Sequence, residues 1–131
     1  MCFHIHPSHK EKKRATKDIV VYKLLRKNSD EIKNYCKLCN RPIPQTEWVT
    51  LFQYTDVNFN ELKRAKFSYN SFRDIEEGLH SYSTINKAKC YCFSVNKKVF
   101  KSIIPKGAYY YYNPNTEEYV STQLLIKEKQ L

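Results

Sequence analysis

The sequence predicts an α+β fold that is rich in β-structure, with one twisted, mixed or mainly antiparallel sheet and one or two short helices. Segments of high β-propensity recur along the chain and are separated by turn residues. Aromatic residues make up 15% of the chain and only two residues are Gly, a composition that favours a packed domain over disorder. The length of 131 residues is sufficient for one domain with one core.

The first 17 residues are predicted to form a basic flexible arm, followed by a single domain over residues 18–131. Residues 1–27 contain eight Lys or Arg and two acidic residues, so they contribute +6 of the formal net charge of +10. Such a segment either solubilises the chain or attracts a polyanion, and residues 10–17 are the expected contact for nucleic acid. The remainder is only mildly basic, which argues against a nucleic-acid footprint over the whole surface.

In the first half of the domain, Asp18–Arg26 is the clearest strand. It is β-branched and apolar on both faces, which suits a central position in the sheet. For Glu31–Tyr35, a weak strand and a helical turn both remain open. Thr46–Tyr54 is predicted to be a strand, Glu61–Lys66 one helical turn, and Phe67–Arg73 an edge strand.

One motif in this half has the spacing of metal ligands. Cys36 and Cys39 form a CxxC pair, the spacing of a zinc knuckle, and a tetrahedral site would need two further ligands. Cys90, Cys92 and the N-terminal histidines are the candidates. A structural zinc ion and metal-free cysteines in the loop or core are the two alternatives, of which the second is favoured. No other cofactor is expected.

In the second half, Ile75–Tyr82 is a predicted strand that Gly78 interrupts with a bulge. Ser83 or Thr84 is expected to cap a short helix that ends near Phe93. A strand over Lys97–Ile104 then enters the last part of the chain.

The segment Ile103–Ile126 is expected to organise the sheet as a hairpin. Residues 105–107 have turn chemistry, because Pro presets φ and Gly accepts a positive φ. Ala108–Tyr112 is a predicted strand, residues 113–116 form a second turn, and Tyr119–Ile126 is the last strand. With glycine so scarce, we expect Gly78 and Gly107 where the backbone requires glycine.

The sequence favours a binding protein over an enzyme. It has no Gly-rich phosphate loop, nucleophile elbow or His-Glu-x-x-His motif. The adjacent pairs Glu76-Glu77 and Glu117-Glu118 would point to opposite faces of a strand, so neither forms a catalytic dyad by itself. No apolar run approaches the roughly 18 residues of a membrane span, and the polar start does not fit a signal peptide. We therefore expect a cytoplasmic protein without membrane contact.

Five segments carry a resemblance to known proteins: the MC start with its basic arm, IVVYKLL, GLHSYST, IIPKGAYYYY and EYVSTQLLI. Together they resemble a family of small proteins encoded by phages and mobile elements of gut Bacteroidetes. The resemblance covers about residues 1–26 and 75–126. It implies the host cytoplasm as the setting. The family has no assigned activity to carry over. Small phage proteins without enzyme motifs often act on the host, so we expect an anti-defence role in which the protein sequesters a nucleotide-derived signal without converting it.

Such a protein needs basic groups for phosphate, aromatic faces for a base, and a concave pocket. Alternate residues of a strand share a face, so pairs on two strands are expected to face the ligand. The predicted ligand-binding residues are Lys23, His80, Tyr82, Lys101, Lys106, Tyr109, Tyr111 and Ser121. For each tyrosine, ordinary packing in the sheet is the competing interpretation and is favoured.

We expect Gly78–Tyr82 to form one wall of this site and Lys106–Tyr111 the other. His80 and Lys106 are expected to contribute charge-assisted hydrogen bonds, each costing on the order of 1–3 kcal/mol of binding when removed.

Two other functions remain open. A nucleic-acid- or host-protein-binding module would use the basic N-terminal arm, and a homo-oligomer is compatible with either binding function. A second resemblance is to ADP-ribosyltransferases, which place a histidine, an aromatic or Ser-Thr-Ser strand and a glutamate around NAD. His80, Tyr82 and Glu117 or Glu118 follow that order.

Overall fold

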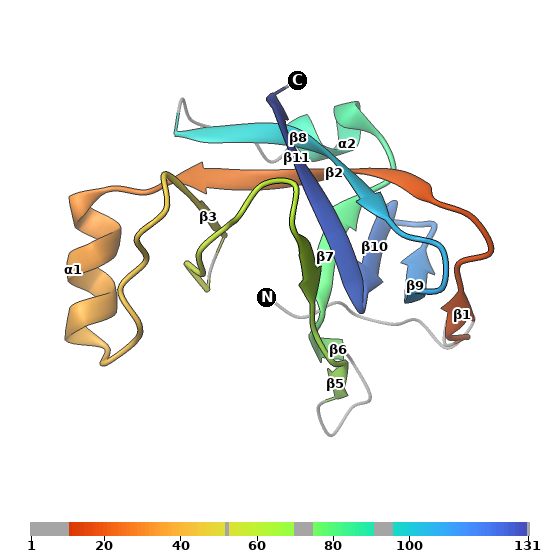
Figure 1. Cartoon of the computed structure of the whole chain (residues 1–131), viewed down its shortest axis with the longest axis horizontal. Helices are drawn as coiled ribbons and strands as arrows, with labels where there is room; N and C mark the ends of the chain where they lie inside the picture. The colour runs from red at the N-terminus through yellow and green to blue at the C-terminus, as the bar shows by residue number, and fades with distance from the viewer. Residues whose placement is uncertain (1–10, 52, 70–74, 91–95, 131) are drawn as a thin grey trace.

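The computed structural model describes residues 11–51, 53–69, 75–90 and 96–130 (Figure 1). Most of the strands within these ranges join one large sheet. Its path, in spatial order, is β1 (Lys13–Arg14), β9 (Tyr109–Asn113), β10 (Glu118–Ser121), β7 (Leu79–Tyr82), β2 (Ile19–Lys27), β8 (Lys97–Ile104), β11 (Gln123–Gln130) and β4 (Leu62–Arg64).

Three further strands complete the β-structure. β3 (Trp48–Thr50) pairs with β2 outside this path, while β5 (Ser68–Tyr69) and β6 (Ile75–Glu77) form a separate two-stranded sheet. Every strand pairing in the described residues is antiparallel. The prediction of a β-rich fold with a mainly antiparallel sheet is therefore confirmed. The described helices are too short to span a membrane.

β2 occupies the centre of the sheet, as predicted. It pairs with β8 without interruption from Ile19↔Ile104 to Arg26↔Lys97. On its other side, its register with β7 consists of the single pair Tyr22↔Tyr82. β7 and β2 therefore diverge beyond this pair, and the divergence leaves space along the first half of β7.

The helix α1 (Asp30–Leu38) projects from one end of β2 (Figure 1). Ser29 caps it, since its hydroxyl accepts a hydrogen bond from the backbone N–H of Ile32 at 3.3 Å. Ile32 and Cys36 are buried against Val49 of β3. Of the two alternatives for Glu31–Tyr35, a weak strand and a helical turn, the structure thus shows a helix. The Ser29 cap and the buried apolar stripe stabilise it.

The helix α2 (Ile85–Lys89) begins where the sequence predicts. The hydroxyl of Thr84 accepts a hydrogen bond from the N–H of Lys87 at 3.1 Å. Ala88 is fully buried against Leu24 and Val99, so α2 covers the face of the sheet opposite the main core. The predicted end of this helix near Phe93 lies outside the described residues.

Two elements of the middle segment differ from prediction. Residues 62–64 form the strand β4, not a helical turn, because they pair with β11 from Leu62↔Leu125 to Arg64↔Gln123. The paired residues are 59 to 63 positions apart in the sequence, so local sequence gives little sign of this pairing. The predicted strand over Thr46–Tyr54 shortens to β3, because Thr50 and Thr55 close a tight turn through a hydroxyl–hydroxyl bond of 2.8 Å.

The C-terminal segment is only in part the hairpin that the sequence predicts. β9 and β10 pair antiparallel across the predicted turn at 113–116, from Glu118↔Asn113 to Ser121↔Tyr110, but β8 and β9 do not pair across residues 105–107. In the described pairings β8 contacts β2 and β11, whereas β9 contacts β1 and β10. The turn at residues 105–107 therefore carries the chain from one part of the sheet to another. The predicted last strand is also two strands, β10 and β11, which separate at Thr122. There the N–H of Thr122 donates to the carbonyl of Tyr109 at 3.0 Å.

The predicted arm is partly integrated into the sheet. Lys13 and Arg14 pair with β9, and Ala15 is buried, with its N–H donating to the carbonyl of Ala108 at 2.8 Å. The prediction of a flexible arm over residues 1–17 is thus wrong for these positions. Residues 1–10 lie outside the described part of the chain.

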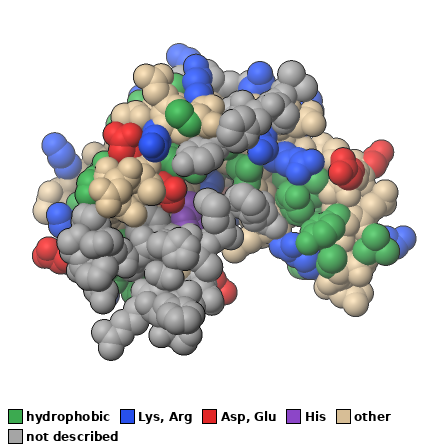
Figure 2. All heavy atoms as spheres, turned by 180° about the vertical axis from the view of Figure 1, so that it is seen from behind, with side chains coloured by type: hydrophobic (Ala, Val, Ile, Leu, Met, Phe, Trp, Pro, Cys, Tyr) green, Lys and Arg blue, Asp and Glu red, His purple; other side chains and the backbone are tan. Residues whose placement is uncertain are grey.

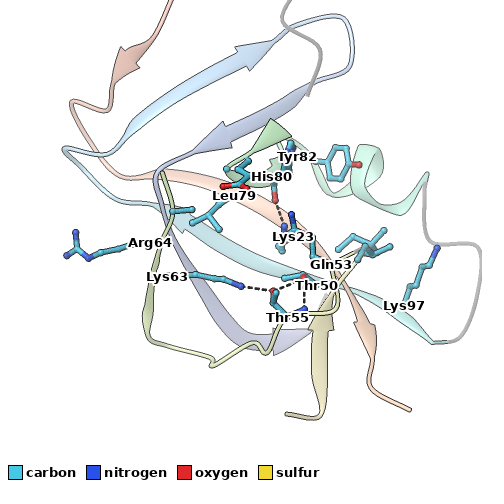
Figure 3. A pocket seen from close by; sticks show the side chains of 15 residues that line it. Lys23, Thr50, Gln53, Thr55, Lys63, Arg64, Leu79, His80, Tyr82 and Lys97 are labelled. Atoms are coloured by element: carbon cyan, nitrogen blue, oxygen red, sulfur yellow. Dashed lines mark hydrogen bonds between the residues drawn. The ribbon is translucent and has the colours of Figure 1, made fainter. Parts of the chain in front are cut away.

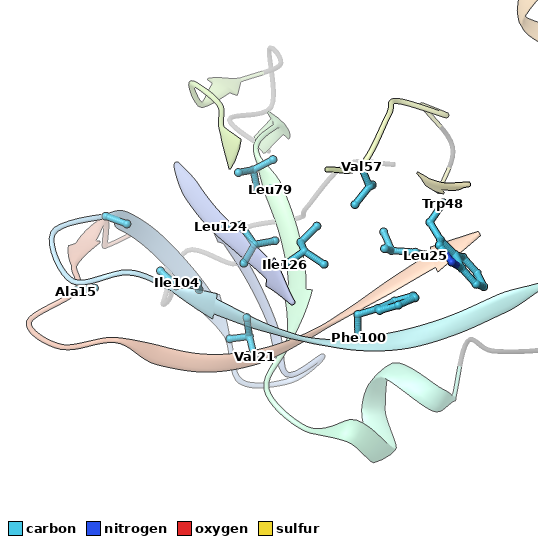
Figure 4. Close-up of a cluster of buried hydrophobic side chains, with 11 residues drawn as sticks. Ala15, Val21, Leu25, Trp48, Val57, Leu79, Phe100, Ile104, Leu124 and Ile126 are labelled. Carbon is cyan, nitrogen blue, oxygen red and sulfur yellow. The ribbon is translucent and has the colours of Figure 1, made fainter. Parts of the chain in front are cut away.

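The main core lies on one side of the curved sheet, where apolar side chains of several strands converge (Figure 4). Phe100 of β8 is central to it, with its ring 5.2 Å from that of Trp48 and 5.1 Å from that of Phe59. Val21 and Leu25 of β2 belong to this core. Because side chains alternate along a strand, Lys23 projects to the same side as these two residues.

Candidate ligand-binding site

A pocket of about 400 Å³ opens where β7 diverges from β2 (Figure 3). Its walls come from β2, β4, β7 and the turn after β3. The described lining residues are Lys23, Leu24, Thr50, Leu51, Gln53, Thr55, Lys63, Arg64, Ala65, Glu77, Gly78, Leu79, His80, Tyr82 and Lys97.

Lys23 crosses the space between β2 and β7. Its ammonium donates a hydrogen bond to the backbone carbonyl of His80 at 2.7 Å (Figure 3). The residue as a whole keeps some exposure, but its nitrogen is surrounded by protein. This burial, with a smaller contribution from the positive charge of Lys63, lowers the pKa of Lys23 to about 7. Near neutral pH, the amine is therefore present in both protonation states.

Lys63 enters the same pocket from β4. Its Nζ donates to the hydroxyl of Thr55 at 3.2 Å, and that hydroxyl bonds to the hydroxyl of Thr50 at 2.8 Å. Burial lowers the pKa of Lys63, while the carboxylate of Asp56 acts in the opposite direction.

The carboxylate of Asp56 is fixed by three hydrogen bonds. Its Oδ1 accepts hydrogen bonds from the N–H groups of Gln45 and Thr46, at 2.6 and 2.8 Å, and from the Thr46 hydroxyl. Partial burial favours the neutral acid, but these hydrogen bonds outweigh it and lower the pKa of Asp56. Asp56 thus serves the loop before and after β3, and it does not line the Lys23 pocket.

The pocket combines positive charge with apolar surface. Among its described lining residues, four are Lys or Arg and only Glu77 is acidic. Leu24, Leu51 and Leu79 contribute the apolar part. A concave site with a few convergent polar groups on an apolar lining is typical of small-molecule binding.

His80 contributes no positive charge at neutral pH. Burial and the nearby charge of Lys23 lower the pKa of its imidazole to about 3. The imidazole is therefore neutral, so in the predicted charge-assisted hydrogen bond from His80 the charge would have to be on the ligand. That bond stays a prediction.

The structure brings three of the eight predicted ligand-binding residues together in the pocket: Lys23, His80 and Tyr82. Lys101 is exposed on β8, on the face opposite the core. Lys106 is exposed in the turn before β9, where its backbone N–H donates to Asp18 Oδ1 at 2.9 Å. Neither of these two lysines lines the pocket.

The other three predicted residues also lie outside the pocket. Tyr109 is exposed at the edge of the sheet. The hydroxyl of Tyr111 bonds to that of Tyr69 at 2.9 Å, and burial, followed by this hydrogen bond, raises the pKa of Tyr111. Ser121 is fully buried and donates to the carbonyls of Leu79 and Gln123. Tyr111 and Ser121 therefore have structural roles.

The two predicted walls do not face each other. β9 is separated from β7 by β10, so Lys106–Tyr111 lies in the same sheet and not across the pocket. The facing wall is β4 with the turn that Thr50 and Thr55 close, and its polar lining residues are Thr50, Gln53, Thr55, Lys63 and Arg64. The sequence indicates this wall only through a basic, partly apolar segment at 62–66. Because that segment is predicted to be a helical turn, the sequence does not place it in the sheet beside the pocket.

The CxxC pair does not form a described metal site. Cys36 is buried beside Ile32 and Val49, whereas Cys39 is exposed at the end of α1. Within the described residues, no group of three or more His, Cys, Asp or Glu is placed to hold a metal ion. A zinc ion with ligands outside these residues stays a prediction.

Comparisons of the chain with protein-family models, curated proteins and solved structures find no match.

Proposed function

We propose that this protein binds a small anionic molecule, foremost a phosphorylated one with an aromatic or apolar part, in the pocket between β2, β4 and β7. The observation that carries this proposal is the convergence of Lys23 and Lys63 on a pocket whose described lining contains one acidic residue, Glu77. Burial disfavours the charged form of both amines, as the lowered pKa of each lysine reflects, and the charge of Lys63 adds a smaller repulsion at Lys23. A bound anion would offset that cost.

The arrangement supports a ligand with two parts. Lys63 and the Thr50–Thr55 hydroxyl pair provide donors suited to phosphate oxygens. Tyr82, Leu24 and Leu51 provide a flat or apolar surface suited to a ring. Nucleotide-derived molecules combine both parts. Our leading proposal is therefore that the protein sequesters such a molecule without converting it. In a phage setting, this would act against a host defence signal.

Binding is tested by calorimetry with cyclic dinucleotides, ADP-ribose and inorganic phosphate. We expect micromolar or tighter binding of at least one nucleotide. Lys63→Met should weaken it about 10- to 100-fold, since one charge-assisted hydrogen bond is lost. Lys101→Met, which removes an exposed lysine outside the pocket, is the matched control. Equal affinity in both variants would place the anion elsewhere.

Conversion is tested on the same samples. Denaturing the complex should release the ligand with unchanged mass. A changed mass would assign the protein to the enzymes and return the ADP-ribosyltransferase alternative to consideration.

A second candidate function, nucleic-acid binding, is favoured by the sheet edge at β1. Lys12 Nζ lies 5.0 Å and Arg14 Cζ 5.9 Å from the ring centre of the exposed Tyr109. Basic groups beside an exposed ring suit a single strand. On the face shown in Figure 2, however, basic side chains are dispersed among acidic and apolar ones.

Charge substitutions test this edge better than a deletion of residues 1–17, which would also remove β1 from the sheet. Binding of a single-stranded oligonucleotide should fall steeply with salt if the edge is used. The double variant Lys12→Gln, Arg14→Gln should flatten that salt dependence. An unchanged dependence would exclude these two residues.

A further inference from the structure

Lys23 differs from the other lysines of the pocket in where its nitrogen lies. Its side chain projects to the core side of β2, between Val21 and Leu25, and protein surrounds its amine. One hydrogen bond, to the carbonyl of His80 at 2.7 Å, fixes the nitrogen at the pocket wall. A second cation, Lys63, enters the same pocket from β4.

Removal from water and a neighbouring cation are the two conditions that convert a lysine into a nucleophile. We propose that Lys23 is a carbonyl-reactive amine, which forms an imine with an aldehyde or ketone ligand that also carries an anionic group. The anionic group of this ligand rests on the proposed function of the pocket. The carbonyl group is inferred only from the environment of Lys23.

The geometry suits this reaction. The hydrogen bond to His80 uses one N–H, which leaves the lone pair of the neutral amine available to the pocket. The lowered pKa of Lys23 makes that neutral form abundant near pH 7. Lys63 keeps its hydrogen bond to Thr55 and attracts the anionic group of the ligand, which orients the carbonyl toward β2.

The step balances without an added oxidant or reductant. The Lys23 nitrogen attacks the carbonyl carbon, a C–N bond forms as the C=O π bond breaks, and one amine proton passes to the carbonyl oxygen to give a carbinolamine. Loss of that hydroxyl together with the remaining amine hydrogen releases one water and gives the C=N bond. Hydrolysis reverses the step, so the ligand is captured and released without net change.

The test uses the full-length protein and pyridoxal 5′-phosphate, an aldehyde with a phosphate group. The mixture is reduced with borohydride at pH 7, and the modified lysines are identified by peptide mass spectrometry. We expect Lys23 to be modified at least about tenfold more than Lys101, because an ordinary exposed lysine is almost fully protonated at this pH. Modification of exposed lysines without preference for Lys23 would overturn the proposal.

The pH dependence of trapping gives a second measurement. Modification of Lys23 should approach its plateau near pH 7 to 8, whereas that of an amine with the ordinary pKa of a lysine would still rise toward pH 10. The other titratable groups facing this space are Lys63, Arg64, Glu77, His80, Tyr82 and Lys97. If trapping at Lys23 still rises toward pH 10, the proposal fails.

Pyridoxine 5′-phosphate, which lacks the carbonyl, separates this inference from the proposed function. If it binds with Lys63-dependent affinity but pyridoxal 5′-phosphate is not trapped at Lys23, the anion pocket stands and the imine is overturned. If unphosphorylated pyridoxal is trapped at Lys23 while pyridoxine 5′-phosphate does not bind, the imine stands and the anionic ligand class is wrong. Lys23→Met should abolish the adduct and Lys101→Met should retain it. Mapping of the modified lysines in the protein without substitutions is already sufficient to test the imine, even if Lys23→Met does not fold.

Discussion

At the residue scale, the environment of Lys23 links the pocket to the pH dependence of stability. The pKa of this lysine is about 7 in the folded protein and 10.5 in an ordinary context. Between these values, the unfolded chain holds a proton that the folded protein has released. Stability therefore rises with pH across this window, and at lower pH the full cost of burying the ammonium is present.

Lys23→Met should remove this dependence. Urea unfolding at several pH values from 6 to 9 is the measurement. We expect the variant to gain stability over the unaltered protein at pH 6, because the buried charge is gone, and this gain should shrink as pH rises toward 9. Lys101→Met, on the exposed face of β8, is the control for removal of a lysine outside the pocket. A constant gain or loss for Lys23→Met would contradict the shifted pKa.

Single residues of the site were predictable only in part. His80 and Tyr82 were recognised because alternation in a strand places them on one face, and both line the pocket. The neutrality of His80 could not be predicted, since it depends on burial by segments distant in sequence. Ser121 was misassigned for a similar reason, because full burial turns a potential ligand donor into a partner for backbone carbonyls.

At the element scale, Gly78 separates β6 from β7 and lets β10 approach. Its φ is +155°, and an added Cβ would collide with Cγ2 of Val120. Gly107 also has a positive φ, +93°, but the atom nearest to a Cβ added there is a nitrogen of the flexible Arg14 side chain, at 3.9 Å.

Gly78→Ala should therefore destabilise the protein by about 2–4 kcal/mol, through steric overlap as well as backbone strain. Gly107→Ala should cost about 1–2 kcal/mol, from backbone strain alone. Urea unfolding of both variants measures the difference. Equal costs would show that the contact with Val120 is relieved by a small shift of β10.

Elements with strong local signals were predicted well, and those defined by distant pairing were not. β2, β8 and α2 follow from β-branched runs and a Thr cap. β4 is a strand because it pairs with β11, and the facing wall of the pocket depends on that pairing. This is why the sequence indicated one wall of the site and missed the other.

At the scale of the whole molecule, the core joins the sheet to the segment that follows β3. Phe100 is about 1% exposed and contacts both Trp48 and Phe59. It thus connects β8 with β3 and with the loop that leads to β4.

Phe100→Ala should lower the free energy of unfolding by about 3–5 kcal/mol, since it leaves a cavity in the core. Trp48, the only tryptophan of the chain, should report the change as altered fluorescence in the folded state. Phe100→Leu is the conservative comparison and should cost less. Unaltered Trp48 emission in Phe100→Ala would contradict the described ring contact.

The single register pair between β2 and β7 divides the large sheet into two halves, β1-β9-β10-β7 on one side and β2-β8-β11-β4, with β3 beside β2, on the other. Next to this seam, the Lys23 amine donates a hydrogen bond to the backbone carbonyl of His80 in β7. The nitrogen of a neutral imine has no hydrogen to donate, so a ligand joined to this amine would remove that bond. A bound ligand should therefore weaken the contact between the two halves of the sheet. Amide hydrogen exchange along β7 should then reveal the ligand even at residues that the ligand itself does not contact.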